Sequence, residues 1–142
     1  MPTIESLQDK YEQINRRFDI HSEREIDPEC LLTFDYKYAG QKAEVVIDTH
    51  EFTAVCPWTG LPDFGTLEIR YIPDQLCIEL KSLKYYILSY SSVGIVQEHA
   101  ANQILNDLVA TCKPSDLSVS LDYNMRGGLH TSVTVQYEKP KV

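Results

Sequence analysis

The sequence lacks the features of several common protein classes. It has no GxGxxG motif and no Gly-rich phosphate loop, which excludes an ordinary dinucleotide-binding fold. It contains no apolar run long enough to span a bilayer, and its opening residues, MPTIESLQDKYEQINRRF, lack the apolar core of a signal peptide. We therefore expect a protein of the cytoplasm.

Patterned cysteines and histidines are absent as well. The four cysteines (Cys30, Cys56, Cys77 and Cys112) form no CxxC pair, and the four histidines form no HxH or HxxxH pattern. In a reducing compartment such cysteines are expected to be free thiols. The sequence therefore predicts neither a disulfide framework nor a metal site.

Clusters of basic residues are missing too. Asp and Glu number 21 against 13 Lys and Arg, which gives a net charge of −8. Proteins that bind nucleic acid normally show a basic stripe, because their affinity comes largely from releasing counterions from phosphates. We therefore expect no direct nucleic-acid partner and no membrane partner, whereas a small, nearly neutral ligand is compatible with this charge.

What is present is a pattern of short strands around two helices. The length of 142 residues predicts one domain, with residues 1–30 as a short helix plus an extended arm and a core over residues 43–138. The predicted strands cover 43–55, 65–73, 76–80, 117–124 and 129–138, and the predicted helices cover 82–92 and 95–112. Strands at both ends with helices between them predict an antiparallel α+β domain, ββααββ, with its helices on one face.

Two turns organise the predicted strands. Pro73-Asp74-Gln75 suggests that 65–73 and 76–80 form a hairpin, and Met125-Arg126-Gly127-Gly128 predicts a second hairpin between the last two strands. The helix over 95–112 stops at Lys113-Pro114.

The stretch AVCPWTGLPDFG (54–65) places Cys56 and Asp63 on one loop stiffened by prolines and glycines. One interpretation is that Cys56 is a small buried filler and Asp63 a turn residue, because free cysteines usually pack as small apolar groups. The other is a thiol and a carboxylate that act together.

At about 100° per residue, Gln97 and Glu98 lie about 40° and 60° from the centre of the apolar stripe of the helix over 95–112, and His99 about 160° away. We therefore expect Gln97 and Glu98 to point inward. Glu98 is either a carboxylate that favours the helix dipole or an acceptor for adjacent N–H donors of a purine-like ring.

The stretch ELKSLKYY (79–86) puts Lys81 and Lys84 three residues apart on one helical face. They are either solvated lysines or contacts for a phosphate-bearing ligand, and Arg126 is either a turn residue or a further anion contact.

Three of these stretches in this order give the chain a family resemblance. CPWTGLPDF (56–64), ELKSLKYY (79–86) and MRGG (125–128) resemble motifs of the single-domain nitrile reductases of queuosine biosynthesis, the NADPH-dependent 7-cyano-7-deazaguanine reductases. The resemblance runs over residues 43–138. It implies the tunnelling fold (T-fold), in which subunits join edge to edge into a barrel, and a homo-oligomer of two stacked pentameric rings with sites between neighbours.

The resemblance also implies roles for individual residues. Cys56 would be the nucleophile and Asp63 the acid-base residue of a reduction that uses two NADPH. The deazapurine substrate would be held by Gln97, Glu98 and the stretch Ile78, Glu79 and Leu80. NADPH would be held by Lys81, Ser82, Lys84 and Arg126.

One departure and three alternatives accompany the resemblance. The family pattern aromatic-His-Glu is replaced by Val96-Gln97-Glu98 here, and glutamine can hydrogen-bond but cannot relay a proton. The alternatives are an amidinotransferase-like enzyme acting on the same nitrile in tRNA, a pterin enzyme of the T-fold, and a non-catalytic purine- or pterin-binding module in which Cys56 is inert.

Overall fold

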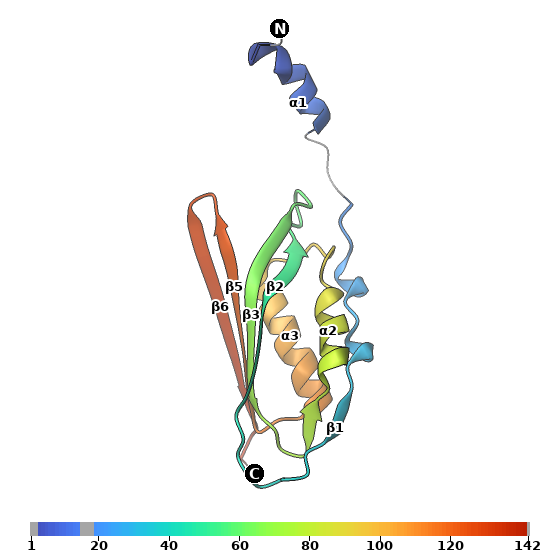
Figure 1. The fold of residues 1–142 in the computed structure, drawn as a ribbon, viewed down its shortest axis with the longest axis vertical. Coiled ribbons are helices and arrows are strands. Elements are labelled where there is room, and N and C mark those ends of the chain that lie inside the picture. The colour runs from blue at the N-terminus through green and yellow to red at the C-terminus, as the bar shows by residue number, and fades with distance from the viewer. Residues whose placement is uncertain (1–2, 15–18, 142) are drawn as a thin grey trace.

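The computed structural model describes residues 3–14 and 19–141 of the chain. Its elements are α1 (Gln8–Ile14), β1 (Thr33–Asp35), β2 (Val45–Val55), β3 (Pro62–Ile72), β4 (Leu76–Ile78), α2 (Leu80–Leu88), α3 (Gln97–Cys112), β5 (Asp116–Arg126) and β6 (Leu129–Glu138). Short 3-10 turns cover Glu5–Leu7, Glu23–Glu25 and Pro28–Cys30. Figure 1 shows that α1 lies apart from the other elements.

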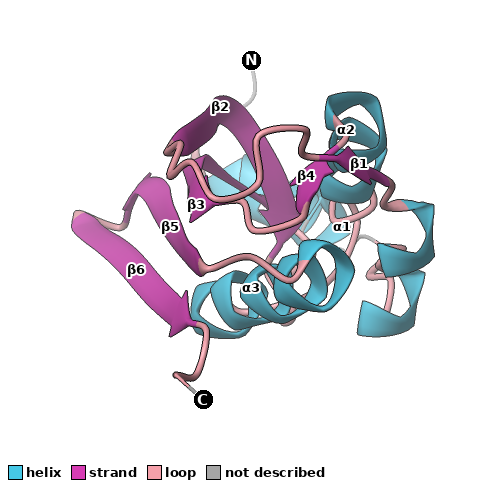
Figure 2. Ribbon diagram, turned by 90° about the horizontal axis from the view of Figure 1, so that it is seen from below, coloured by secondary structure: helices cyan, strands magenta, loops and turns pink. Residues whose placement is uncertain are grey.

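The long strands form an antiparallel sheet in the order β2-β3-β5-β6. β3 lies between β2 and β5. Tyr71 of β3 is paired with Val45 of β2, and Gly65 of β3 is paired with Tyr123 of β5. Helices α2 and α3 lie on one face of this sheet (Figure 2). The chain order β2, β3, α2, α3, β5, β6 confirms the predicted α+β class and its ββααββ core.

The core lies between that sheet face and α3. Alternate residues of β3 and β5 are buried, because successive side chains of a strand point to opposite faces. They include Leu67 and Ile69 from β3 and Leu117, Val119 and Leu121 from β5. The stripe on α3 that helical spacing predicts is also buried, and it consists of Ala101, Ile104, Leu105, Leu108 and Cys112.

The prediction that residues 76–80 form a hairpin with residues 65–73 is wrong. β4 pairs instead with β1 in a separate two-stranded antiparallel sheet, in which Thr33 lies opposite Ile78. The physical reason is that both edges of β3 are already occupied by β2 and β5, so no edge of β3 is left for β4.

The predicted helix over 82–92 also has different ends. α2 begins at Leu80 and ends at Leu88. The Ser89 hydroxyl donates to the Tyr86 carbonyl and the Ser91 hydroxyl to the Leu88 carbonyl. Such local side-chain bonds compete with the helical ladder, and the chain leaves the helix at this point.

The helix α3 confirms the predicted helix over 95–112, with its first residue at Gln97. It ends where Lys113 adopts a left-handed conformation (φ 47°), directly before Pro114. None of the described helices is long and apolar enough to cross a membrane.

The N-terminal arm is attached to the segment before α3. The backbone N–H of His21 donates to the Ser92 carbonyl at 2.9 Å, and the N–H of Gly94 donates to the His21 carbonyl at 3.0 Å. Within the predicted helix and arm over residues 1–30, α1 supplies the helix, while 1–2 and 15–18 lie outside the described residues.

Candidate active site

Cys56 lies in the tight loop that connects β2 to β3. The Cys56 N–H donates to the Leu61 carbonyl at 2.9 Å, and the Gly60 N–H donates back to the Cys56 carbonyl at 2.8 Å. Gly60 has a φ of +75°, a conformation that residues with a side chain rarely adopt. The loop therefore has a defined backbone shape that presents the thiol at the end of the hairpin.

This loop is also joined to the segment that leads into α3. The Val55 N–H donates to the Val93 carbonyl at 3.0 Å, and the Ile95 N–H donates to the Val55 carbonyl at 3.3 Å. A Cβ on Gly94 would come within 3.1 Å of the Pro57 Cα, so only glycine allows this approach without displacement. The position of Cys56 is thereby linked to the start of α3.

Hydrogen bonds around the Cys56 sulfur favour its thiolate. Burial by itself raises the pKa of this thiol, and the Asp63 carboxylate raises it slightly more. Hydrogen bonds from the Thr59 hydroxyl and from the backbone N–H groups of Thr59 and Trp58 outweigh both effects, so the pKa lies below its usual value of 9.0. A lower pKa increases the thiolate fraction, which is the nucleophilic form.

The other cysteines have different surroundings. Burial raises the pKa of Cys30, and it raises the pKa of Cys112 to about 12. Cys77 is buried, and all four cysteines are free thiols. Cys56 therefore combines partial exposure with a pKa shifted toward the reactive form.

Asp63 lies on the same hairpin, in β3 and opposite Ala54. Ala54 and Asp63 share the sheet face that the helices cover, and Asp63 lies near enough to Cys56 for its charge to raise the pKa of the thiol. The Asp63 carboxylate is buried, and Arg126 at the end of β5 donates from Nη1 to Asp63 Oδ1 at 2.9 Å. The Arg126 guanidinium lies over the Tyr123 ring, 4.9 Å from its centroid.

Gln97 points inward as predicted, but Glu98 does not. Gln97 is only 3% exposed, and its side-chain nitrogen donates to the carbonyls of Leu121 and Thr131 at 2.7 and 2.8 Å. Its Oε1 is buried and has no hydrogen-bond partner among the described residues, and the same holds for the Tyr123 hydroxyl. Glu98 is exposed, because it lies at the margin of the apolar stripe and no described residue covers that margin. His99 is exposed as predicted.

The stretch from Ile78 to Leu80 forms the junction between β4 and α2. The Ile78 N–H donates to the Tyr71 hydroxyl at 3.0 Å, and the Glu79 N–H donates to the Leu32 carbonyl at 2.9 Å. The Glu79 carboxylate caps α2 by accepting from the N–H groups of Lys81 and Ser82, and these bonds lower its pKa. Leu80 is exposed.

The predicted cofactor residues differ in accessibility. Lys81 and Lys84 are exposed on α2. Ser82 is buried, with its hydroxyl donating to the Glu79 carbonyl and accepting from the Leu32 N–H, and its contact with a cofactor stays a prediction. Arg126 lies at the β5–β6 hairpin with its guanidinium on Asp63, and does not join the two lysines.

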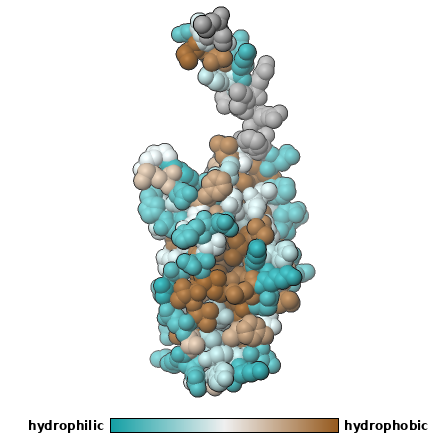
Figure 3. All heavy atoms as spheres, viewed as in Figure 1, coloured by the Kyte–Doolittle hydropathy of each residue, from teal (hydrophilic) through white to brown (hydrophobic). Residues whose placement is uncertain are grey.

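An apolar groove runs between α2 and β2, with a volume of about 240 Å³. Figure 3 shows apolar side chains gathered in the middle of this face of the molecule. The groove is lined by Ile47, Thr49, Glu51, Leu80, Leu83, Lys84, Ile87 and Leu88. The predicted phosphate contact Lys84 therefore stands beside a mostly apolar hollow.

One chain does not bring the predicted substrate residues together. Gln97 begins α3, a helix of 16 residues that is about 24 Å long at 1.5 Å per residue. Cys77, adjacent to Ile78, lies close enough to Cys112, at the other end of α3, to affect its pKa. Residues 78–80 and 97–98 thus lie near opposite ends of one helix.

Three residues near the thiol carry no strong signal in the sequence. Thr59 hydrogen-bonds to the Cys56 sulfur, Gly94 leaves room for Pro57, and the Tyr123 ring lies beneath the Arg126 guanidinium. A hydroxyl three residues after a cysteine in a Gly-containing turn is the one local hint, since such side chains often bond to nearby groups.

Among residues 3–14 and 19–141 no group of His, Cys, Asp and Glu is arranged to hold a metal ion.

Comparisons with known proteins agree on one family. The family model described as QueF-like protein matches residues 62–142. An NADPH-dependent 7-cyano-7-deazaguanine reductase of Caldicellulosiruptor bescii is 51% identical over 133 residues, which cover 94% of this chain and 100% of the relative. The reductase of the same name from Thermoanaerobacter pseudethanolicus is 47% identical over 135 residues, which cover 95% and 100%.

A solved structure shares the fold. The crystal structure of the archaeosine synthase QueF-Like in the apo form has a TM-score of 0.65 and covers 71% of this chain and 99% of its own. Its sequence is 21% identical, so this likeness concerns the fold alone.

Proposed function

The chain belongs to the QueF-like family of NADPH-dependent 7-cyano-7-deazaguanine reductases, and we propose that Cys56 is the residue that attacks the nitrile of the substrate. The observation that carries this proposal is the half-buried Cys56 thiol on a hydrogen-bonded hairpin loop that also leads to the buried Asp63, and the lowered pKa of the thiol supports it. A cytoplasmic location, with its reducing conditions, would keep this residue a thiol.

The chemistry needs a nucleophile because a nitrile carbon is a poor hydride acceptor. Addition of the Cys56 thiolate forms a thioimide, whose carbon accepts hydride more readily. The addition also requires a proton on the nitrile nitrogen. Asp63 is buried on the same hairpin as Cys56, which supports a role as the group that carries this proton.

We propose the surface of α2 as the cofactor site. The mostly apolar groove beside this helix suits a flat ring, and the exposed Lys81 and Lys84 supply positive charge for phosphates, so these residues fit NADPH. Two NADPH, bound in succession, supply the two hydrides that convert a nitrile into a primary amine. Leu80, Ile87 and Leu88 supply apolar surface along the groove wall.

We further propose that the deazapurine ring binds between two chains of a homo-oligomer. Residues 78–80 and residues 97–98 lie near opposite ends of α3 within one chain, so they can hold one ring only if neighbouring chains each supply one group. The exposed Glu98 is then an acceptor for the adjacent ring N–H donors. Among the described residues, the edge strands β2 and β6 each pair with one strand of this sheet, so most of each outer edge could pair with such neighbours.

The experiment is turnover of 7-cyano-7-deazaguanine by the pure protein with NADPH, followed by cofactor absorbance and by the mass of the product. We expect two NADPH to be oxidised for each 7-aminomethyl-7-deazaguanine formed. Product formation that requires an amine donor instead of NADPH would identify an amidinotransferase-like enzyme. Tight binding without turnover would identify a binding module, and either outcome would contradict the proposal.

A further inference from the structure

The ion pair between Asp63 and Arg126 differs from the other ion pairs of the described residues. The Asp63 side chain is 9% exposed, whereas the Arg126 side chain is 48% exposed. In the other pairs the carboxylate is at least 30% exposed. A buried carboxylate is costly without a partner, and the Arg126 guanidinium that reaches in from the hairpin tip supplies one.

The contact involves one oxygen of the carboxylate. Arg126 Nη1 donates to Asp63 Oδ1 at 2.9 Å, and among the described residues no donor bonds to Oδ2. The guanidinium is supported by the Tyr123 ring below it, 4.9 Å from the centroid. Arg126 therefore holds Asp63 with one oxygen engaged and the other free.

We propose that Arg126 is a positioning residue that fixes Asp63 Oδ1, so that Asp63 Oδ2 transfers the proton of the Cys56 thiol to the nitrile nitrogen. This inference rests on the proposed function of Cys56. This role of Arg126 is separate from its predicted contact with the cofactor, because the proton transfer takes place before any hydride is delivered.

The step balances in atoms and charge. The thiol proton moves to Asp63 Oδ2, and the sulfur electron pair forms the C–S bond to the nitrile carbon. One π bond of the nitrile breaks, and its electron pair takes the proton from Oδ2 to give the N–H of the thioimide. Asp63 is again an anion at the end, and no oxidation or reduction occurs.

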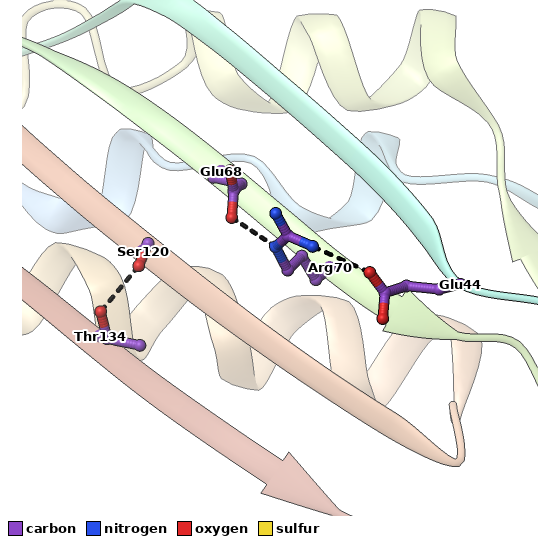
Figure 4. A network of polar contacts seen from close by, with 5 residues as sticks. All are labelled: Glu44, Glu68, Arg70, Ser120 and Thr134. Atoms are coloured by element: carbon purple, nitrogen blue, oxygen red, sulfur yellow. Dashed lines mark hydrogen bonds and ion pairs between the residues drawn. The ribbon is translucent and has the colours of Figure 1, made fainter.

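The experiment measures formation of the covalent adduct without NADPH, which separates this role from cofactor binding. Quenched samples at saturating substrate are followed by intact mass for the parent and for Arg126→Gln, Arg126→Lys, Asp63→Asn and the double variant Asp63→Asn/Arg126→Gln. Arg70→Gln is the matched control: Arg70 pairs with Glu44 and Glu68 on the outer face of the sheet (Figure 4). Substrate affinity is measured separately, in a Cys56→Ala background.

We expect Arg126→Gln to slow adduct formation about tenfold or more, because positioned proton transfer contributes roughly 10²–10⁴-fold to rates. Arg126→Lys should recover part of the rate, substrate affinity should change less than about twofold, and Arg70→Gln should match the parent. In the Asp63→Asn background, Arg126→Gln should have no further effect, since both residues act through one proton.

Two results would overturn the inference: adduct formation by Arg126→Gln at the parent rate, or an undiminished effect of Arg126→Gln in the Asp63→Asn background. Absence of any adduct in the parent is a different result, because it removes the proposed role of Cys56 and this inference with it.

Discussion

Gly94 lies directly against Pro57, so that a Cβ on Gly94 would come within 3.1 Å of the Pro57 Cα and would overlap the Ile20 side chain. Pro57 follows Cys56 in the β2–β3 loop, and Gly94 precedes α3. Through this contact, the position of Cys56 depends on the position of the segment before α3.

Gly94→Ala should displace this loop. We expect slower reaction of Cys56 with substrate and a loss of stability of about 1–3 kcal/mol, the usual cost of overpacking. Gly40→Ala is the control: Gly40 has a φ of +99° with no atom within 4 Å of its Cβ position, so it should lose stability without any change at Cys56. Equal adduct rates for the two variants, measured by intact mass, would contradict the coupling.

Thr59→Ala should raise the pKa of Cys56, because it removes the side-chain hydrogen bond that favours the thiolate. The rate of alkylation by iodoacetamide increases as the thiolate forms. In Thr59→Ala this increase should therefore occur at a higher pH than in the parent. Thr59→Ser keeps the hydroxyl and should preserve the profile. Thr53→Ala, which loses a hydroxyl bonded to the Glu51 carbonyl, is a second control. An unchanged profile in Thr59→Ala would be inconsistent with this cause of the shift.

Glu79→Gln should destabilise the protein in a pH-dependent manner. Bonds from the N–H groups of Ser82 and Lys81 lower the pKa of Glu79 below 4.5, so its charge stabilises the fold above the unfolded pKa. That stabilisation is lost as the pH falls through the folded pKa. The difference in melting temperature between parent and variant should therefore be largest near neutral pH and should narrow below about pH 4. A constant difference across this range would exclude the charged cap.

Glu98→Gln should weaken substrate binding at least about tenfold, since a hydrogen bond to a charged acceptor contributes about 1.5–3 kcal/mol. The substitution also directs an N–H donor at the donors of the ring. His99→Ala should be nearly silent, because His99 is exposed away from the apolar stripe. Calorimetry in the Cys56→Ala background measures both. Loss of binding in His99→Ala with normal binding in Glu98→Gln would reverse the assignment.

Local patterns predicted the parts of the fold that depend on neighbours in sequence. Alternation located β5 and β6, and helical spacing located α3 and the inward Gln97. The pairing of β4 with β1 was not predictable in this way, because it depends on which edges of β3 are already occupied.

In the candidate site, too, features that depend on neighbours in sequence were predictable, and contacts between distant residues were not. Cys56 and Asp63 lie close together in sequence on one hairpin, so one motif suggests both. The ion pair of Asp63 with Arg126 joins residues 63 positions apart, and no periodicity reports such a contact. The exposure of Glu98 depends on what covers the margin of α3, which the spacing of its own residues does not specify.

The central claim is that Cys56 forms a covalent bond with the nitrile carbon. The most direct measurement is the intact mass of the protein after incubation with 7-cyano-7-deazaguanine in the absence of NADPH, for the parent and for Cys56→Ala, with Cys30→Ala as the matched control. We predict a mass increase of one substrate molecule in the parent and in Cys30→Ala, and none in Cys56→Ala. An adduct of the same mass in Cys56→Ala would contradict the account.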